Sequence, residues 1–491
     1  GFIPNTDLNK HAINLNSTLR LTKALSVSTS LNYAKSFSDN RAAGNRGANP
    51  IQAMYEIAPH IDVRGMKDYW LPGYEGLYQN SPYQWGDDPT ESTEWNNPYF
   101  LANEARNSFM RNRFYGNVKA DWQITEDFSA FVRYNFDELN EDRETKISSG
   151  YTKEMNGAYG ITDIFRNEVN IDYLLTYKKK FDNWDFTVSF GGNQRKYKST
   201  STTNQTKNGG QGLLIPNLFT LYNIAPDNLF YNNYTSEKQV NSLYGLASIG
   251  FKNFLYVDVT GRNDWSSTLP EGNNSYFYPS VSGSLLLNNV FDMGDKISLI
   301  KLRAGYAEVG NDTDPYNLDP VLNNQGTWGK GLMLSVPASL LNPDLKPESQ
   351  ESWEVGADLA FFQNRLSISG TYYVSNNRNQ IFPVQSPISS GYSSQLINAG
   401  LLTNKGYEGS LNSTIIANSN WHWDMGFVFT KNKTWVMELP EGLDRIDFWR
   451  DAKGGASTWI GEEVGTIYDR AMVRVDDVDS PYYGWPILDE D

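Results

Sequence analysis

The chain has 491 residues, no cysteine and a formal net charge of −15, and 14% of its residues are aromatic. The lack of cysteine excludes disulfides and thiolate metal sites within these residues, and the acidic balance argues against a nucleic-acid surface, which needs a basic patch. No stretch reaches the roughly 18 apolar residues of a membrane helix, although alternating barrel strands would give the same negative mean hydropathy of −0.55.

The sequence predicts seven pairs of short alternating strands, in which nearly every turn inside a pair is short and nearly every connection between pairs is long. The pairs are 11–21 with 24–36, 114–124 with 127–137, 167–178 with 184–197, 239–251 with 254–262, 278–287 with 297–309, 351–362 with 365–376, and 404–417 with 420–432. Short turns on one side and long loops on the other are typical of an outer-membrane β-barrel. We therefore expect an all-β fold, a transmembrane antiparallel β-barrel of which about 14 strands are visible here.

The long connections should face outward from the cell and carry the specificity of the protein. They include residues 37–112, 198–238, 310–350 and 377–403. No segment differs in composition as a separate domain usually would. Residues 1–491 are therefore predicted to form part of one barrel rather than several domains.

The alternation also predicts which side chains meet lipid. In 114–124, Val118 and Trp122 lie on one face and Lys119 and Asp121 on the other. A Lys or Arg facing lipid at mid-membrane costs about 2–4 kcal/mol. The charged side chains within the strands are therefore expected to face the lumen, namely Lys119, Asp121, Arg133 and Asp424.

Aromatic residues gather close to the predicted short turns. They include Trp122, Trp184, Trp421 and Trp423. Amphipathic rings at strand ends are what a membrane-interface girdle needs. The alternative is that aromatic residues simply favour strands, but their clustering at strand ends favours the girdle and contact with a lipid bilayer.

Several motifs occur in a specific order. They are Gly261–Arg262–Asn263–Asp264–Trp265–Ser266–Ser267, Asn342–Pro343–Asp344–Leu345–Lys346–Pro347–Glu348, Asn404–Lys405–Gly406–Tyr407–Glu408 and Gly461–Glu462–Glu463–Val464–Gly465–Thr466–Ile467–Tyr468. In this order and spacing, over nearly all of the chain, the sequence resembles the SusC/RagA family of TonB-dependent transporters from Bacteroidetes outer membranes.

The resemblance implies a 22-stranded barrel filled by an N-terminal plug and energised by TonB from the periplasm. It also implies a SusD-like surface lipoprotein that closes over the barrel as a lid. Neither the plug nor the C-terminal barrel strands are recognised in the sequence, so we expect these residues to be a barrel fragment. For Asn263, Asp264 and Trp265, a structural role in the loop is expected.

A catalytic or metal site is not expected, and neither is a cofactor. The three histidines (His11, His60 and His422) are far apart and in no paired spacing, and no GxSxG, HExxH or GxxxxGK motif occurs. The acidic stretch 476–491 places Gly484 and Glu490 as a calcium loop beginning at Asp479 would. Pro481 and Tyr483 then occupy two ligand positions, so a solvated loop is expected instead.

The first long connection is rich in rings amid Asn, Asp, Gly and Pro. The candidate ligand or lid contacts there are Trp70, Trp85, Trp95, Tyr83 and Tyr99. Such rings can stack on sugars or take up peptide side chains. Tyr and Trp are also enriched at protein interfaces, and packing against the lid or within the loop is the alternative.

The leading hypothesis is therefore active import of oligosaccharides or peptides across the bacterial outer membrane, with a lipoprotein lid and TonB as partners. A second hypothesis is a TonB-dependent receptor for a metal chelate or vitamin, without a lid. A passive porin or adhesin and a soluble carbohydrate-binding β-protein are more distant alternatives. A plug upstream of the strands would exclude the porin, and extraction without detergent would indicate the soluble protein.

Overall fold

The computed structural model describes residues 3–41, 49–82, 95–440, 442–450, 454–469 and 473–487. Seven antiparallel hairpins dominate these residues, as the sequence predicts. They are β1 (Asn9–Arg20) with β2 (Leu25–Ser38), β3 (Ala105–Gln123) with β4 (Phe128–Ile147), β5 (Ala158–Phe181) with β6 (Trp184–Thr206), β7 (Leu229–Phe251) with β8 (Leu255–Ser266), β9 (Ser275–Leu286) with β10 (Ile297–Asn311), β14 (Glu348–Phe361) with β15 (Leu366–Gln385), and β16 (Ser394–Ala417) with β17 (His422–Glu438).

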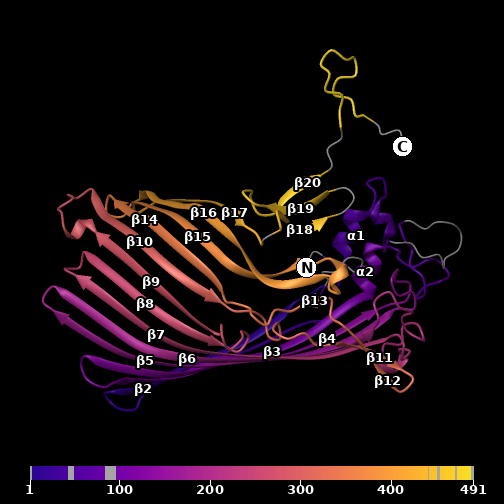
Figure 1. The fold of residues 1–491 in the computed structure, drawn as a ribbon, viewed down its shortest axis with the longest axis horizontal. Helices are drawn as coiled ribbons and strands as arrows, with labels where there is room; N and C mark the ends of the chain where they lie inside the picture. The colour runs from indigo at the N-terminus through magenta and orange to yellow at the C-terminus, as the bar shows by residue number, and fades with distance from the viewer. Residues whose placement is uncertain are drawn as a thin grey trace. The chain divides into compact units, whose positions relative to one another are not determined.

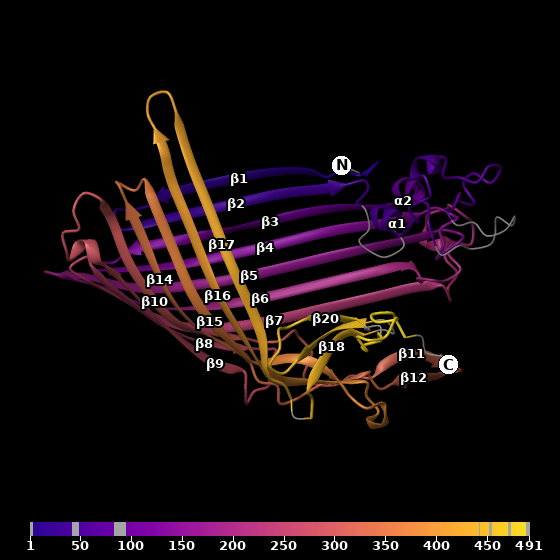
Figure 2. The ribbon, with the colours of Figure 1, turned by 90° about the horizontal axis from the view of Figure 1, so that it is seen from above.

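The chain divides into two compact units, Gly1–Leu174 with Asn193–Gln239 and Leu175–Gly192 with Val240–Asp491. β1 to β7 are neighbours in chain order; β1 to β4 lie wholly in the first unit, and Figure 2 shows them side by side (β2 to β4 are also labelled in Figure 1). In the second unit β8, β9, β10, β14, β15 and β16 are neighbours in that order, and β17 pairs with β16. Both units are therefore meanders in which nearly every strand pairs with the next one along the chain.

The register between β3 and β4 is unbroken, from Ala105 opposite Ile147 to Gln123 opposite Ser129. Residues opposite each other share a face of the sheet. Lys119 lies opposite Arg133, which places both on the polar face. The predicted alternation of faces is therefore present in this hairpin.

The strands extend further toward the long connections than the apolar alternation predicts. β3 begins at Ala105 rather than 114, β4 continues to Ile147, and β16 begins at Ser394 rather than 404. The strand limits predicted beside 37–112, 198–238, 310–350 and 377–403 were therefore wrong by several residues, and the connections are shorter. The added residues, such as Glu138–Lys146, are polar on both faces, so the ladder continues where the apolar period has ended.

Some of the tight turns use left-handed backbone. Lys252 and Asn253, between β7 and β8, have φ values of 48° and 58°. Two successive residues with positive φ form a turn whose twist matches that of the flanking strands. Asn tolerates this conformation better than most residues, so the short turns are encoded locally.

The longer connections contain small elements of their own. These are α1 (Pro50–Glu56), η1 (Val63–Met66), α2 (Pro98–Glu104), η2 (Leu221–Asn223), η3 (Leu287–Asn289), β11 (Asn323–Trp328), β12 (Gly331–Ser335), β13 (Ser339–Leu340), η4 (Ile388–Ser390), β18 (Arg445–Arg450), β19 (Gly454–Trp459) and β20 (Thr466–Asp469). β11 pairs with β12, and β18, β19 and β20 form a separate three-stranded sheet. Within the described ranges, no helix combines the length and apolarity needed to cross a membrane.

Candidate functional site

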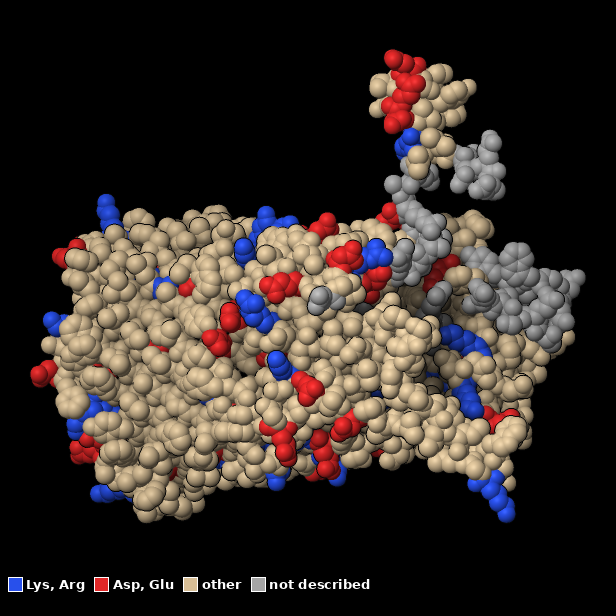
Figure 3. Space-filling view, in the orientation of Figure 1, with Lys and Arg blue, Asp and Glu red and all other residues tan. Residues whose placement is uncertain are grey.

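One face of the hairpins carries exposed apolar side chains. On β3 these include Phe114, Val118 and Trp122. Over β8, β9 and β10 the surface in Figure 3 is almost free of charged side chains, and Val259 and Phe277 are exposed there. Rows of exposed apolar residues on a regular sheet suit contact with lipid rather than water.

The four tryptophans of the predicted girdle lie beside the short turns. Trp122, Trp184, Trp421 and Trp423 are all exposed. Around Trp184 the rings gather further, because its centroid lies 4.4 Å from that of Phe251. This placement suits a membrane-interface girdle, which stays a prediction.

The opposite face of the first unit is cross-linked by charge pairs between neighbouring strands. Arg133 on β4 donates to Asp172 on β5 at 2.9 Å, and within β3 Lys119 contacts Asp121 at 2.5 Å. These side chains include three of the four predicted to face the lumen. The fourth, Asp424 in the second unit, accepts from Thr414 Oγ1 at 2.7 Å, on the face of β17 that it shares with Thr414 of β16.

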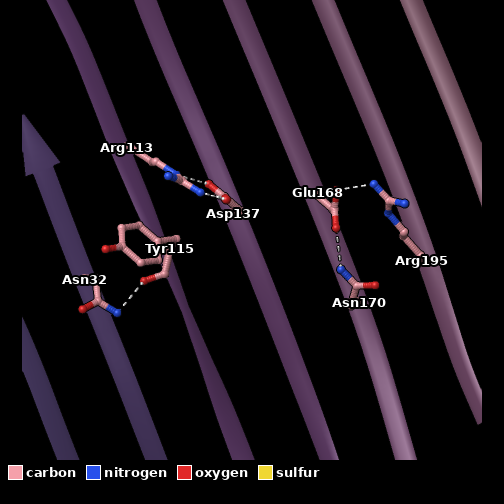
Figure 4. A network of polar contacts seen from close by, with 7 residues as sticks. All are labelled: Asn32, Arg113, Tyr115, Asp137, Glu168, Asn170 and Arg195. Atoms are coloured by element: carbon pink, nitrogen blue, oxygen red, sulfur yellow. Dashed lines mark hydrogen bonds and ion pairs between the residues drawn. The ribbon is translucent and has the colours of Figure 1, made fainter. Parts of the chain in front are cut away.

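Figure 4 shows that the cross-links continue along this face. Arg113 on β3 pairs with Asp137 on β4, and Glu168 on β5 accepts from Arg195 on β6 at 2.8 Å. Nearer the long connections, the buried carboxylate of Glu141 contacts arginines on either side. Opposite charges on adjacent strands help to fix the register between those strands. Most of these pairs are accessible to water, so each one alone contributes little to the stability of the fold.

The first long connection packs largely against itself. The Trp70 ring meets the fully buried Phe100 edge-on, with 5.4 Å between ring centroids, and both belong to a cluster with Leu101 and Tyr151. Trp95 and Tyr99 are half-buried, and Tyr83 and Trp85 lie outside the described residues. The structure therefore favours the self-packing alternative for Trp70.

Asn97, a fully buried amide, ties several parts of this connection together. Asn97 caps α2 by accepting from the backbone N–H of Tyr99 at 2.8 Å. Its Nδ2 also donates to the backbone oxygens of Met66 and Asn80, at 3.0 and 2.8 Å. Nothing in the sequence distinguishes this asparagine from its many neighbours except the Asn-Pro pair at a helix start.

A second buried polar side chain joins two connections of the first unit. Glu154, between β4 and β5, is buried and accepts from the backbone N–H of Gly209, between β6 and β7, at 2.7 Å. Burial raises the pKa of Glu154, only partly offset by that N–H and by the charge of Lys153. Burial and the nearby Glu154 raise the pKa of Tyr151 to about 12.

The raised pKa of Glu154 predicts that acid strengthens this junction. A carboxyl whose folded pKa lies above its unfolded value stabilises below the unfolded pKa, and this stability is lost as pH rises through the folded pKa. Hydrogen exchange of residues 148–157 is therefore expected to slow between pH 7 and pH 5, after correction for intrinsic rates. Glu154→Gln keeps an acceptor without the charge and should abolish this change. Glu271→Gln, at an exposed loop carboxylate, should leave it intact; an identical pH response in Glu154→Gln would contradict the assignment.

Two of the motifs found in the sequence meet in the second unit. Leu269, next to the GRNDWSS motif, and the fully buried Leu345 of the NPDLKPE motif share a cluster with Leu396. Asn273 donates to the backbone oxygen of Leu345 at 3.2 Å. Glu348 accepts from the backbone N–H of Ile381 at 2.8 Å. The motifs thus tie together the connections that leave β8, β10 and β15.

The expected structural role of the loop motif agrees with its contacts. Asp264 is buried and accepts from Arg262 Nε at 2.8 Å and from the Tyr278 hydroxyl at 2.7 Å. Asn263 donates to Ser275 Oγ at 3.0 Å across the same strand pair. These contacts join β8 to β9, and a ligand is not needed to explain them.

Alternation alone does not reveal a hollow on the polar face of the second unit. It has a volume of about 500 Å³ and crosses β9, β10, β14, β15 and β16. Ser280, Gly305, Ser352, Ser375 and Asn404 are among the residues that line it. The available signal in the sequence was the small polar residues at alternate positions of these strands. Only the register between the strands shows that these residues lie next to one another.

Among the residues that the structure describes, no group of three or more His, Asp or Glu side chains could hold a metal ion. His422 pairs with Asp424 at 2.8 Å in an exposed position. The acidic C-terminal segment 473–487 carries a cluster of red atoms in Figure 3, formed by Asp476, Asp477 and Asp479.

Comparison with known proteins gives a consistent result. Residues 59–447 match the family described as "TonB dependent receptor-like, beta-barrel". The chain is 26% identical over 498 aligned residues to TonB-dependent receptor P3 of Formosa agariphila, covering 95% of this chain and 46% of that protein. It is 25% identical to TonB-dependent receptor SusC of Bacteroides thetaiotaomicron, covering 86% and 42%. The chain therefore spans about half the length of the curated relatives it matches.

Solved structures show the same fold. The structure of the RagAB peptide importer in the closed-closed state matches with a TM-score of 0.74 and 21% identity, over 93% of this chain and 49% of that chain. The ferripyoverdine receptor of Pseudomonas aeruginosa matches with a TM-score of 0.51 and 11% identity, over 93% and 55%. Both likenesses concern the fold alone.

Proposed function

We propose that this chain, which belongs to the TonB-dependent receptor β-barrel family, forms part of the wall of an active importer for oligomeric nutrients. Proteins of this family are outer-membrane transporters and receptors, not enzymes. The all-β barrel fold and the outer-membrane location predicted from the sequence are thereby confirmed. The imported material is proposed to be glycan or peptide.

The observation that carries the proposal is that the sheet has one apolar and one polar face. The resemblance of the sequence to the SusC/RagA branch of the family narrows the proposal further. Apolar side chains cover one face, and charge pairs such as Arg133 with Asp172 cross-link the other. A polar lumen on many strands suits a wide barrel. The fold agrees better with the RagAB peptide importer than with the ferripyoverdine receptor, at TM-scores of 0.74 and 0.51.

The proposed partners are a SusD-like surface lipoprotein and TonB. The lipoprotein would close over the long connections, and TonB would act through a plug that belongs to the full-length receptor. Trp85, Trp95, Tyr83 and Tyr99 remain proposed contacts for this lid or for the ligand, whereas Trp70 is packed within its own loop. Substrate would be trapped between lid and plug, and force on the plug would open the way.

A receptor for a metal chelate or vitamin, without a lid, is the second candidate. The fold shared with the ferripyoverdine receptor favours it. The two candidates differ in what accompanies the barrel in the membrane, which makes them separable by purification.

The test is to purify the intact protein from native outer membranes in mild detergent and to identify the accompanying molecules by mass spectrometry. A SusD-like lipoprotein in stoichiometric amount, with bound oligosaccharide or peptide, is the expected result. A barrel that stays alone under gentle extraction would contradict the lid and favour the chelate or vitamin receptor.

A further inference from the structure

The hollow on the polar face of the second unit has the properties of a binding site. We propose that it is a subsite for a neutral oligosaccharide in transit along the barrel wall, an inference that rests on the proposed import function. Its volume of about 500 Å³ falls within the range of ordinary ligand pockets, about 300–1,000 Å³.

The hollow exists because a row of residues, aligned across neighbouring strands, has small side chains. The register aligns Ser280 with Ala307, Ala307 with Ser352, and Ser352 with Ser375 across four neighbouring strands. Gly305, at the next level, lacks a side chain beside Ser282. An added Cβ there would lie no closer than 3.6 Å to another side chain. The hollow is therefore open space above a continuous ladder and involves no break in the sheet.

Larger side chains at its edge lie flat over glycines instead of filling it. The Tyr373 ring lies over Gly406, where an added Cβ would come within 2.5 Å of the ring. Arg303 lies over Gly356 in the same way, at 2.7 Å from the position of an added Cβ. Both bulky side chains are thus directed along the wall, and Tyr373 lines the hollow.

The lining is rich in hydroxyls and acceptors and poor in charge. Glu354 is the one charged side chain that lines the hollow, and none of the described residues forms a hydrogen bond or ion pair with its carboxylate. The Asn404 Oδ1 is shielded from water and has no donor among the described residues. Gln350 Nε2 already donates to Ser375 Oγ at 2.5 Å. An occupant that brings O–H donors would satisfy the Glu354 carboxylate, whereas the shielded Asn404 Oδ1 lies out of its reach.

This chemistry favours sugars over other cargo. A saccharide presents several hydroxyl donors and an apolar ring face that can lie on an aromatic ring such as Tyr373. A peptide would need a pocket for its apolar side chains, but Val281 and Trp353 direct their side chains to the other face of the sheet. An anionic metal chelate would meet the Glu354 carboxylate, and Arg303 at the edge is already paired with Asp358.

The polar face of the first unit has a different design. There, long charged side chains such as Arg133 and Asp172 span adjacent strands and occupy the surface. From β3 to β5 this cross-linked stretch presents mainly charged and amide side chains rather than small hydroxyls. A neutral polyhydroxyl ligand therefore has better-matched partners at the hollow than on that wall.

The experiment uses the full-length receptor in native outer membranes. The 491 residues contain no cysteine, so Ser282→Cys and Ser352→Cys each place the only thiol of this segment at the hollow, and labelling is read at that position by peptide mass spectrometry. Ser410→Cys is the matched control, because it lies on the same polar face but outside the lining. A membrane-impermeant methanethiosulfonate reagent reports access, with neutral α- and β-glucan, mannan, xylan and galactan oligosaccharides and a neutral alanine–glycine peptide as probes.

At least one oligosaccharide is expected to slow labelling at Ser282→Cys and Ser352→Cys about fivefold or more, without affecting Ser410→Cys. Ala307→Trp, which fills the hollow, should reduce energy-dependent uptake of that sugar about tenfold while the barrel still assembles. Protection by no sugar, protection by the peptide, equal protection at Ser410→Cys, or thiols that are unreactive before sugar is added would each overturn the subsite.

Uptake by the parent receptor separates this inference from the function on which it rests. Receptor-dependent uptake of a sugar without protection at either thiol would leave import standing and refute the subsite. If uptake of neither sugars nor peptides depends on the receptor, the proposed function fails and the subsite fails with it.

Discussion

Replacing Gly116 by alanine is expected to remove most of the correctly assembled barrel from the outer membrane. An added Cβ at this position in β3 would overlap the backbone carbonyl oxygen of Ser30 on β2. A backbone oxygen within a strand ladder cannot move aside as the end of a flexible side chain can. Overpacking usually costs about 1–3 kcal/mol, and we expect about 3 kcal/mol or more here, because the clash separates two paired strands.

The assembled fraction can be measured by heat-modifiable migration of outer-membrane protein on gels, and stability by urea unfolding in detergent micelles. Gly370→Ala is the matched control, since it is also a strand glycine but an added Cβ there meets nothing within 4 Å. Assembly equal to the parent in Gly116→Ala would show that β2 and β3 are not held together as closely as described.

Replacing Asn97 by alanine should unfold the first long connection while leaving the barrel assembled. The substitution removes the cap of α2, worth about 1 kcal/mol. It also leaves the backbone oxygens of Met66 and Asn80 without the donor that Asn97 supplies. A buried acceptor without a partner costs about 1–3 kcal/mol, so the total for the connection should reach about 3 kcal/mol.

Hydrogen exchange of residues 49–104 measures this effect directly, and limited proteolysis gives a second reading. We expect protection in the connection to fall by about two orders of magnitude, as about 3 kcal/mol implies, with the strands unchanged. Asn233→Ala is the control, because Asn233 is exposed and makes one side-chain hydrogen bond, to Thr202 Oγ1 at 2.8 Å. Equal protection in Asn97→Ala and Asn233→Ala would refute the central role of Asn97.

The hairpin pattern was predictable because the two faces of a strand meet different surroundings, so one face is apolar and the other polar. Where one face is apolar, as at Val118 and Trp122, the period of two is visible in the sequence and the hairpin was found. Where both faces are polar, as in Glu138–Lys146, no periodicity remains, although the register with β3 continues. The ends of the strands were therefore missed for a physical reason: pairing of the backbone does not require an apolar face.

The candidate site was predictable only in part. Composition showed that the first connection is rich in rings, but it could not tell that Trp70 packs on Phe100. The expected structural role of Asp264 agrees with its contacts to Arg262 and Tyr278. The hollow was invisible in the sequence, because Ser280 and Ser375 lie 95 positions apart and meet at one level only through the register of the strands between them.

The long strands have a consequence for how the cell surface is recognised. β16 has 24 residues, or about 79 Å of chain at about 3.3 Å per residue, whereas the apolar band of such barrels is about 25 Å tall at a strand tilt of about 35–45°. The exposed Trp421 and Trp423 lie near the short-turn end, so the surplus stands on the side of the long connections. An antibody or phage approaching from outside would therefore meet rigid, hydrogen-bonded strand ends beneath the loops. Epitopes on these strand ends should be conformational and lost on heat denaturation.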